Sequence, residues 1–287
     1  MIERTQFAVV LALLFALLFV LERRVALRRR SRPLLGRLLI NVCISALAFA
    51  AAMLSARPAA LAVVQWAMDR PFGVIHVVPM PEAAQFVLSF LLMDLTFYWW
   101  HVANHRIPFL WRFHNVHHID PDLDVSTAFR FHWGEVALST GFRVVQVSAI
   151  GLSAPMFAIY ELVFQANTLC HHSNVRLPIR IERLLNLVLV TPRMHGIHHS
   201  QVREETNSNY SVVFSWWDRA HRTAGLNIPQ ADIVIGIPAY SDPADNRLWN
   251  GLLLPFRPQR DYWRDPDGTI VQRDRAVSSE KRSRLAE

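Results

Sequence analysis

The chain has 287 residues, of which 52% are hydrophobic and only 18% charged, and its formal net charge is +7. Such an apolar composition is unlike that of a typical soluble domain. The positive charge comes almost entirely from arginines that lie between apolar runs, and the lack of a clustered basic face on a recognisable module excludes nucleic acid as the expected partner. The two cysteines, Cys43 and Cys170, form neither a metal-binding C-x-x-C pair nor a disulfide framework.

Apolar segments near the length that crosses a bilayer begin close to the N-terminus. The first lacks a basic region before it and is followed by arginines, which predicts a retained membrane helix and no secretory signal peptide. A further stretch, residues 59–79, is apolar but interrupted by Asp69, Arg70 and Pro71, and we expect it to lie at the membrane interface. The predicted membrane segments are residues 5–21, 35–56, 84–103 and a pair within 134–169 that divides near 151–155.

Arginine placement predicts the orientation of these segments. Loop 22–37 is dense in arginine, which places it on the cytoplasmic side of the membrane. Counting crossings from this loop, segment 84–103 ends in the cytoplasm, and a hairpin over 134–169 returns the chain there again. All the histidine clusters described next are therefore expected on one side.

The motif H-x-x-H-H occurs twice, as "HNVHH" at 114–118 and as "HGIHH" at 195–199. On a helix, positions i, i+3 and i+4 share one face, so we expect each motif to aim three imidazole rings at one point. His101 and His105 form an H-x-x-x-H pair at the end of segment 84–103, and the adjacent His171 and His172 follow the last apolar segment. The clustered histidines are His101, His105, His114, His117, His118, His171, His172, His195, His198 and His199.

So many imidazoles predict two metal ions, because one zinc ion needs only three or four ligands. Nitrogen-rich ligation suits iron, copper, zinc or nickel and argues against magnesium or calcium. Asp94 lies in an apolar run and within about 20° of both His101 and His105 on a helical projection. We expect its carboxylate to accept a ring N–H from one of these two histidines when the histidine binds metal.

Other histidines and one glutamate are less certain members of a site. His132 and Glu135 open the apolar segment that follows, and the sequence leaves open whether they are ligands, supporting residues or interfacial anchors. We expect His76, on the outer side, to be structural and His221 to lie on the surface.

The order of the histidine motifs resembles that of the fatty acid hydroxylase/sterol desaturase superfamily of membrane non-haem diiron oxygenases. "DLTFYWWHVANH", "FHNVHH", "HSNVRLP" and "TPRMHGIHHS" are similar to its histidine boxes, and "NSNYSVVFSWWDRAHRT" is similar to the ending that follows them. The resemblance covers roughly residues 85–225. Val102 stands where the family usually has arginine, Ser211 replaces a glycine and "AHRT" replaces "LFGT", which leaves substrate preference open.

The resemblance implies which histidines bind the metal, while His171 has no firm counterpart in the family. The implied ligands are His101, His105, His114, His117, His118, His172, His195, His198 and His199. Together with the apolar segments, this predicts an all-α protein with four to five membrane segments and a cytoplasmic, histidine-rich helical cap that holds two metal ions.

The expected organisation has four parts. Residues 1–80 hold the N-terminal membrane segments and the interfacial stretch, and residues 81–225 form the catalytic core with the histidine boxes. Residues 226–264 form a loop extension. Residues 265–287 are charged and poor in apolar side chains, which predicts a disordered tail.

The function that the resemblance implies is O2-dependent hydroxylation or desaturation of a C–H bond in a sterol or fatty-acyl lipid. Two iron ions are the implied cofactor and O2 the co-substrate. Because the chain has no haem, flavin or dinucleotide motif, we expect an external electron donor, a ferredoxin or a cytochrome b5-type protein. The expected location is a bacterial inner membrane, with the active site on the cytoplasmic side.

Two other classes of protein remain open from the residues alone. A zinc-dependent membrane hydrolase also needs a metal site, but the chain has no H-E-x-x-H motif and more histidines than one zinc requires. A metal transporter would place its ligands near the middle of the bilayer, and a membrane haem protein would usually pair single histidines. Metal analysis combined with O2 uptake distinguishes these classes.

Overall fold

The computed structural model describes residues 4–68, 70 and 72–273 of the chain. Within these residues, helices of α, 3-10 and π type are joined by loops, and the only β-pairing is in isolated bridges, with no β-strand. The expected all-α fold is therefore confirmed for the part of the chain that the structure describes.

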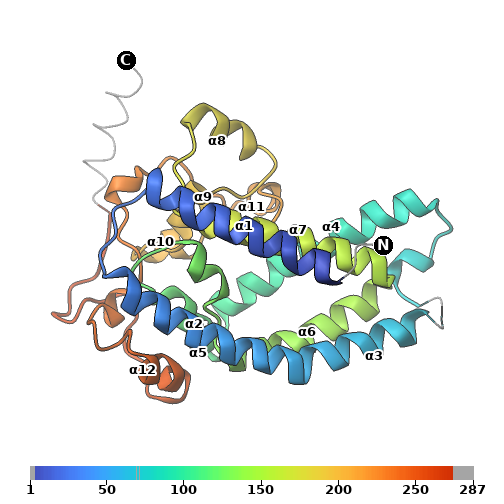
Figure 1. Ribbon diagram of the computed structural model, residues 1–287, viewed down its shortest axis with the longest axis horizontal. Coiled ribbons are helices and arrows are strands. Elements are labelled where there is room, and N and C mark those ends of the chain that lie inside the picture. The colour runs from blue at the N-terminus through green and yellow to red at the C-terminus, as the bar shows by residue number, and fades with distance from the viewer. Residues whose placement is uncertain (1–3, 69, 71, 274–287) are drawn as a thin grey trace.

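The long helices run side by side along the long axis of the molecule (Figure 1). Pro33 and Pro81 directly precede two of them, at positions where the missing N–H breaks no helical hydrogen bond. Gly151 ends another with a φ of 88°, a conformation that favours glycine. These helices are α1 (Arg4–Arg24), α2 (Leu34–Ala51), α3 (Arg57–Met68), α4 (Glu82–Arg106), α6 (Trp133–Ile150) and α7 (Ala154–His172), and a π-helical turn, Ala52–Ala56, joins α2 to α3.

Three of the described helices are long and apolar enough to cross a membrane, namely Thr5–Arg24, Leu34–Leu54 and Glu82–Arg106. This is fewer than the expected four to five. The pair expected within 134–169 does form a helical hairpin, α6 and α7, but polar side chains lower its hydropathy. Arg143 pairs with Glu161 across the hairpin at 3.0 Å, so the two helices satisfy part of their own polar groups.

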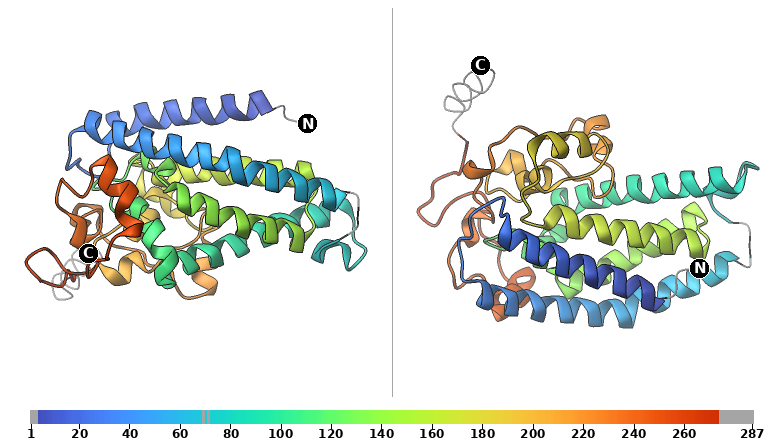
Figure 2. Two further views of the ribbon diagram at one scale, coloured as in Figure 1. Left: turned by 90° about the horizontal axis from the view of Figure 1, so that it is seen from below. Right: turned by 45° about the horizontal axis from the view of Figure 1, so that its top comes forward.

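The short helices gather at one end of the bundle, where α1, α4 and α7 end and α2 and α6 begin (Figure 1). The two views in Figure 2 show the same end from other sides. The short helices are α5 (Pro108–His118), α8 (Ile179–Leu185), α9 (Pro192–His198), α10 (Arg203–Thr206), α11 (Trp216–Ala220) and α12 (Leu248–Leu253), with 3-10 turns at Val125–Phe129, Gln230–Asp232, Pro238–Tyr240 and Leu254–Phe256. A further 3-10 turn, Val74–His76, lies at the opposite end, beside Gly151.

The C-terminal part of the chain packs against this end. Ile237, Tyr240 and Leu254 form an apolar cluster with Ile44 of α2 and Trp111 of α5. Of the expected tail, residues 265–273 are described and the remaining residues, 274–287, lie outside the described part. The C-terminal extension thus covers α5, which carries one of the H-x-x-H-H motifs.

Candidate metal centre

The nine histidines predicted to bind metal come together in two adjacent groups. In each group one ring nitrogen of every histidine lies within 4.8 Å of the others, and all the rings are buried except that of His105, which is half-buried. The five-histidine group contains His101, His105, His114, His118 and His198, and the four-histidine group contains His117, His172, His195 and His199.

Each H-x-x-H-H motif divides between the two groups. In α5, His114 and His118 join the five-histidine group while His117 joins the other; around α9, His195 and His199 join the four-histidine group while His198 joins the other. The expectation that each motif aims at one point is therefore wrong. Positions i and i+4 are about 40° apart around a helix, whereas position i+3 lies about 60° to the other side.

Four of these histidines have a ring tautomer fixed by a hydrogen bond at Nδ1. His101 lies 2.7 Å from the Tyr210 carbonyl oxygen and His198 lies 2.6 Å from that of Ser208. His172 has the same contact with the Thr168 carbonyl at 2.8 Å, and His114 with a carboxylate oxygen of Glu135 at 2.8 Å. These oxygens only accept, so Nδ1 must carry the hydrogen and Nε2 of each neutral ring keeps a free lone pair.

The free Nε2 atoms face one another at short distances. Nε2 of His101 and Nε2 of His114, both without a hydrogen, lie 3.2 Å apart, and the free Nε2 of His172 lies 3.0 Å from Nε2 of His195, whose tautomer no Nδ1 hydrogen bond fixes. Burial, followed by the neighbouring histidines, holds the pKa of His195 well below its usual value, so the ring is neutral near pH 7. Facing lone pairs repel unless a cation lies between them. The arrangement of neutral, converging nitrogens therefore fits a metal ion in each group.

Comparison with known proteins gives a direct match for this region of the chain. The fatty acid hydroxylase family model matches residues 86–223, a range that includes both histidine groups. Residues 86–223 are thus similar to the fatty acid hydroxylase family, and we call them the hydroxylase domain.

Curated relatives are similar to about half of the chain. The ornithine lipid hydroxylase OlsE of Rhizobium tropici is 32% identical over 139 residues, which are 48% of this chain and 41% of the relative. Human alkylglycerol monooxygenase is 31% identical over 140 residues, 47% of this chain and 29% of the relative. Rat cholesterol 25-hydroxylase is 27% identical over 146 residues, 48% of this chain and 47% of the relative. The matched parts span less than half of each of these relatives, and no solved structure matches the chain.

Asp94 does not occupy the position expected of it in the hydroxylase domain. Its carboxylate accepts hydrogen bonds from the indole of Trp217 at 2.8 Å and from the backbone N–H groups of Phe214 at 3.0 Å and Val213 at 3.3 Å. The expected bond to His101 or His105 is wrong because the helical projection ignores the rise along the axis. Seven residues of helix separate Asp94 from His101 by about 10 Å.

The remaining candidates lie in the hydroxylase domain and join neither histidine group. Glu135 bonds to His114, as described above, and His132 caps α6 by accepting the Gly134 N–H at 3.0 Å. The buried His171 ring lies 4.2 Å from that of His195, centroid to centroid. His221 stacks on Tyr98 with ring centroids 4.7 Å apart.

Polar residues of the N-terminal helices, which sequence reasoning missed, hold the loop that follows α5. Arg37 forms ion pairs with Asp124 and, at 2.9 Å, with Asp120, and Asn41 donates to Asp120 at 3.0 Å. Burial opposes ionisation of Asp120, but the guanidinium groups of Arg37 and Arg130 outweigh it and lower the pKa of this carboxyl. An ionisable residue inside an apolar segment indicates a functional role. By this criterion the sequence could have indicated Arg37 as well as Asp94.

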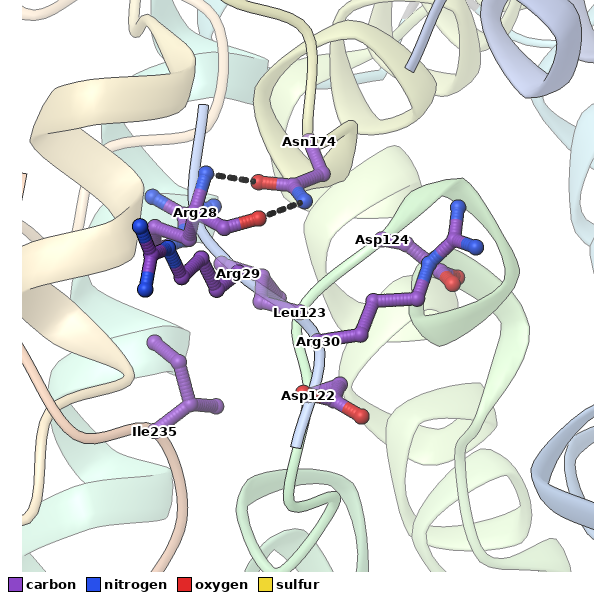
Figure 3. A pocket seen from close by; sticks show the side chains of 8 residues that line it. All are labelled: Arg28, Arg29, Arg30, Asp122, Leu123, Asp124, Asn174 and Ile235. Atoms are coloured by element: carbon purple, nitrogen blue, oxygen red, sulfur yellow. Dashed lines mark hydrogen bonds between the residues drawn. The ribbon is translucent and has the colours of Figure 1, made fainter. Parts of the chain in front are cut away.

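The arginine-rich loop between α1 and α2 is also bound to the hydroxylase domain. Asn174, two residues after His172, accepts from the Arg28 backbone N–H at 2.9 Å and donates to the Arg28 carbonyl at 2.8 Å (Figure 3). The Arg28 side chain then reaches Gln230 at 2.5 Å. Residues outside the matched segment thus form part of the wall around the histidines.

We expect Gly196→Ala to destabilise the protein and weaken metal retention. A Cβ at Gly196, within α9, would overlap the Arg28 guanidinium and touch Gln230, which are buried and bonded to each other. Such overpacking costs about 1–3 kcal/mol and displaces the helix that carries His195 and His198. Thermal unfolding and metal content of the purified protein measure the effect.

Gly141→Ala is the matched control, because a Cβ at this α6 position meets nothing within 4 Å. An unchanged or raised melting temperature is expected there, since alanine favours a helix over glycine by about 1 kcal/mol. Equal melting temperatures for both variants would contradict the packing assigned to Gly196.

Proposed function

We propose that the protein is a membrane-bound oxidoreductase that uses two iron ions and O2 to hydroxylate a C–H bond of a lipid. The observation that carries the proposal is the pair of adjacent all-histidine groups inside a fatty acid hydroxylase domain. The names of the relatives support it, since they are lipid hydroxylases and monooxygenases. These relatives act on three different lipids. The proposed substrate is therefore a sterol or fatty-acyl lipid, without a choice of one compound.

The side chains of the domain hold the ions and exclude water. When bound, the two ions supply the O2 chemistry that oxidises the C–H bond. The rings of both groups present Nε2 atoms whose direction is fixed in four cases by hydrogen bonds at Nδ1. Burial of these rings keeps bulk water from the reacting centre.

We also propose that α1, α2 and α4 cross the membrane and that the α6–α7 hairpin enters it, giving four to five membrane segments. Exposed apolar side chains support lipid contact, among them Leu13 of α1 and Leu39 of α2, which are 66% and 58% exposed. The arginine-rich loop between α1 and α2 lies at the histidine end of the bundle (Figure 1). By the positive-inside rule, this supports an active site on the cytoplasmic side of a bacterial inner membrane.

An external protein is proposed as the electron donor, either a ferredoxin or a cytochrome b5-type protein. Exposed arginines at the histidine end offer a basic surface for an acidic donor, and such charge complementarity speeds association. These are Arg24, Arg29, Arg30, Arg176 and Arg180.

Two measurements test the proposed function. Purified full-length protein is expected to contain iron and to consume O2 when given a lipid extract, a reductant and a ferredoxin. Lipids from cells with and without the gene, compared by mass spectrometry, are expected to differ by a product that is one oxygen atom heavier. A product lacking two hydrogens would identify a desaturase instead. A chain that holds zinc and consumes no O2 would contradict the proposal and favour a hydrolase or a transporter.

A further inference from the structure

Segment 208–214, between α10 and α11, presents the carbonyl groups of alternate residues to three helices that carry histidines. The Ser208 carbonyl accepts from Nδ1 of His198 on α9, and the Tyr210 carbonyl accepts from Nδ1 of His101 on α4. The next carbonyl in the alternation, that of Val212, accepts from Asn167 on α7. The first two contacts set the ring tautomer of two members of the five-histidine group.

The N–H groups of the same segment are held by two buried carboxylates. Asp218 accepts from the backbone N–H of Tyr210 at 2.8 Å and of Ser211 at 2.9 Å. Asp94 accepts from those of Val213 and Phe214, as described above. Asp218 is 0% exposed and Asp94 1% exposed, so neither carboxylate has water as an alternative partner. The Ser211 N–H shares a peptide unit with the Tyr210 carbonyl and the Val213 N–H shares one with the Val212 carbonyl, so Asp218 and Asp94 hold the segment on both sides of Ser211 and Val212.

We propose that Asp218 and Asp94 are positioning residues for the five-histidine group and act through segment 208–214. By holding the segment that carries the carbonyls of Ser208 and Tyr210, they keep the Nδ1 hydrogens of His198 and His101 in place and direct both Nε2 atoms at the metal. This inference rests on the proposal that the histidines bind metal, and it assigns a role to Asp218 that the histidine motifs do not indicate.

The geometry makes the effect selective for one of the two groups. In the four-histidine group, the hydrogen bond that fixes Nδ1 runs from His172 to Thr168, one turn earlier in the same helix. That bond does not involve segment 208–214. Loss of either carboxylate is therefore expected to weaken metal binding at the five-histidine group and to leave the four-histidine group intact.

The experiment is a Co²⁺ titration of the metal-free, full-length protein in detergent, followed by absorption spectroscopy. The wild-type chain is expected to bind in two phases, and His114→Ala identifies the phase that belongs to the five-histidine group. In Asp218→Asn, an amide N–H₂ replaces one acceptor oxygen of the carboxylate and faces a backbone N–H. The dissociation constant of Co²⁺ at the five-histidine group is expected to rise about 10–100-fold, and that of the four-histidine group should stay unchanged.

Asp94→Asn, on a different helix, should likewise weaken Co²⁺ binding at the five-histidine group alone. This variant tests the inference if Asp218→Asn does not fold. Asp245→Asn is the control, because that carboxylate pairs only with Arg260 away from the histidines, and both phases should match wild type. Equal weakening of both phases, or of neither, in the two test variants would overturn the inference. A wild-type chain that binds no Co²⁺ would instead refute the proposed function.

Discussion

His195→Ala is expected to remove metal from the four-histidine group and to reduce lipid oxidation below detection. Nε2 of His195 lies 3.0 Å from that of His172 and 3.1 Å from that of His199, so this ring connects the group. The group would keep three of its four nitrogens and lose the ring that links them, and the metal content is expected to fall by about one ion per chain. Metal analysis and product detection by mass spectrometry measure the two effects.

His76→Ala is the matched control for this variant. His76 lies in the turn before α4, where its Nε2 contacts the Gly151 carbonyl at 3.2 Å at the far end of the hairpin. Both metal content and activity should therefore equal those of the wild type. A fully active His195→Ala enzyme with normal metal content would remove this histidine from the site.

Arg37→Met is expected to give the largest loss of stability. The substitution leaves Asp120 and Asp124, which are both buried, without the guanidinium that pairs with them. Removing one partner of a buried ion pair costs about 3–5 kcal/mol, because the remaining charge has no compensation. Thermal unfolding followed by tryptophan fluorescence should show a much lower midpoint, with less metal in both histidine groups.

Two further variants test the reason for this loss. Arg24→Gln changes an exposed arginine at the end of α1 and should leave the midpoint unchanged. Adding Asp120→Asn to Arg37→Met removes one of the two carboxylate charges that have lost their Arg37 partner and should recover part of the stability. An Arg37→Met protein as stable as wild type would show that the ion pairs around this loop contribute nothing.

The histidine set could be predicted from the sequence because the signal is local. Residue type and spacing indicated ten clustered histidines, and the family resemblance selected from them the nine that the fold brings into the two groups. The division of each motif between two groups was not predicted, although helix geometry contains it. The position of Asp94 was predicted wrongly because rotation about a helix axis was used without the rise along it.

Other parts of the site leave no local pattern in the sequence. The carbonyls of Ser208 and Tyr210 contact histidines through the backbone, so their side chains give no indication of it. Arg37 meets Asp120 across 83 positions of the chain, and only tertiary packing creates that pair. Three helices meet the length and hydropathy of a membrane span, and the two further predicted segments, α6 and α7, carry polar groups such as Arg143 and Glu161 that pair with each other, so their place in the membrane stays a prediction.

The division of the H-x-x-H-H motifs has a consequence for the spacing of the two groups. Both α5 and α9 contribute to each group, so two separate helices join the groups through a single turn of backbone. The geometry of an α-helix therefore fixes the separation of the two groups in α5 and again in α9, and the conformation of the loops does not enter. Movements of the surrounding loops can change what reaches the histidines, but they leave the distance between the two groups unaltered.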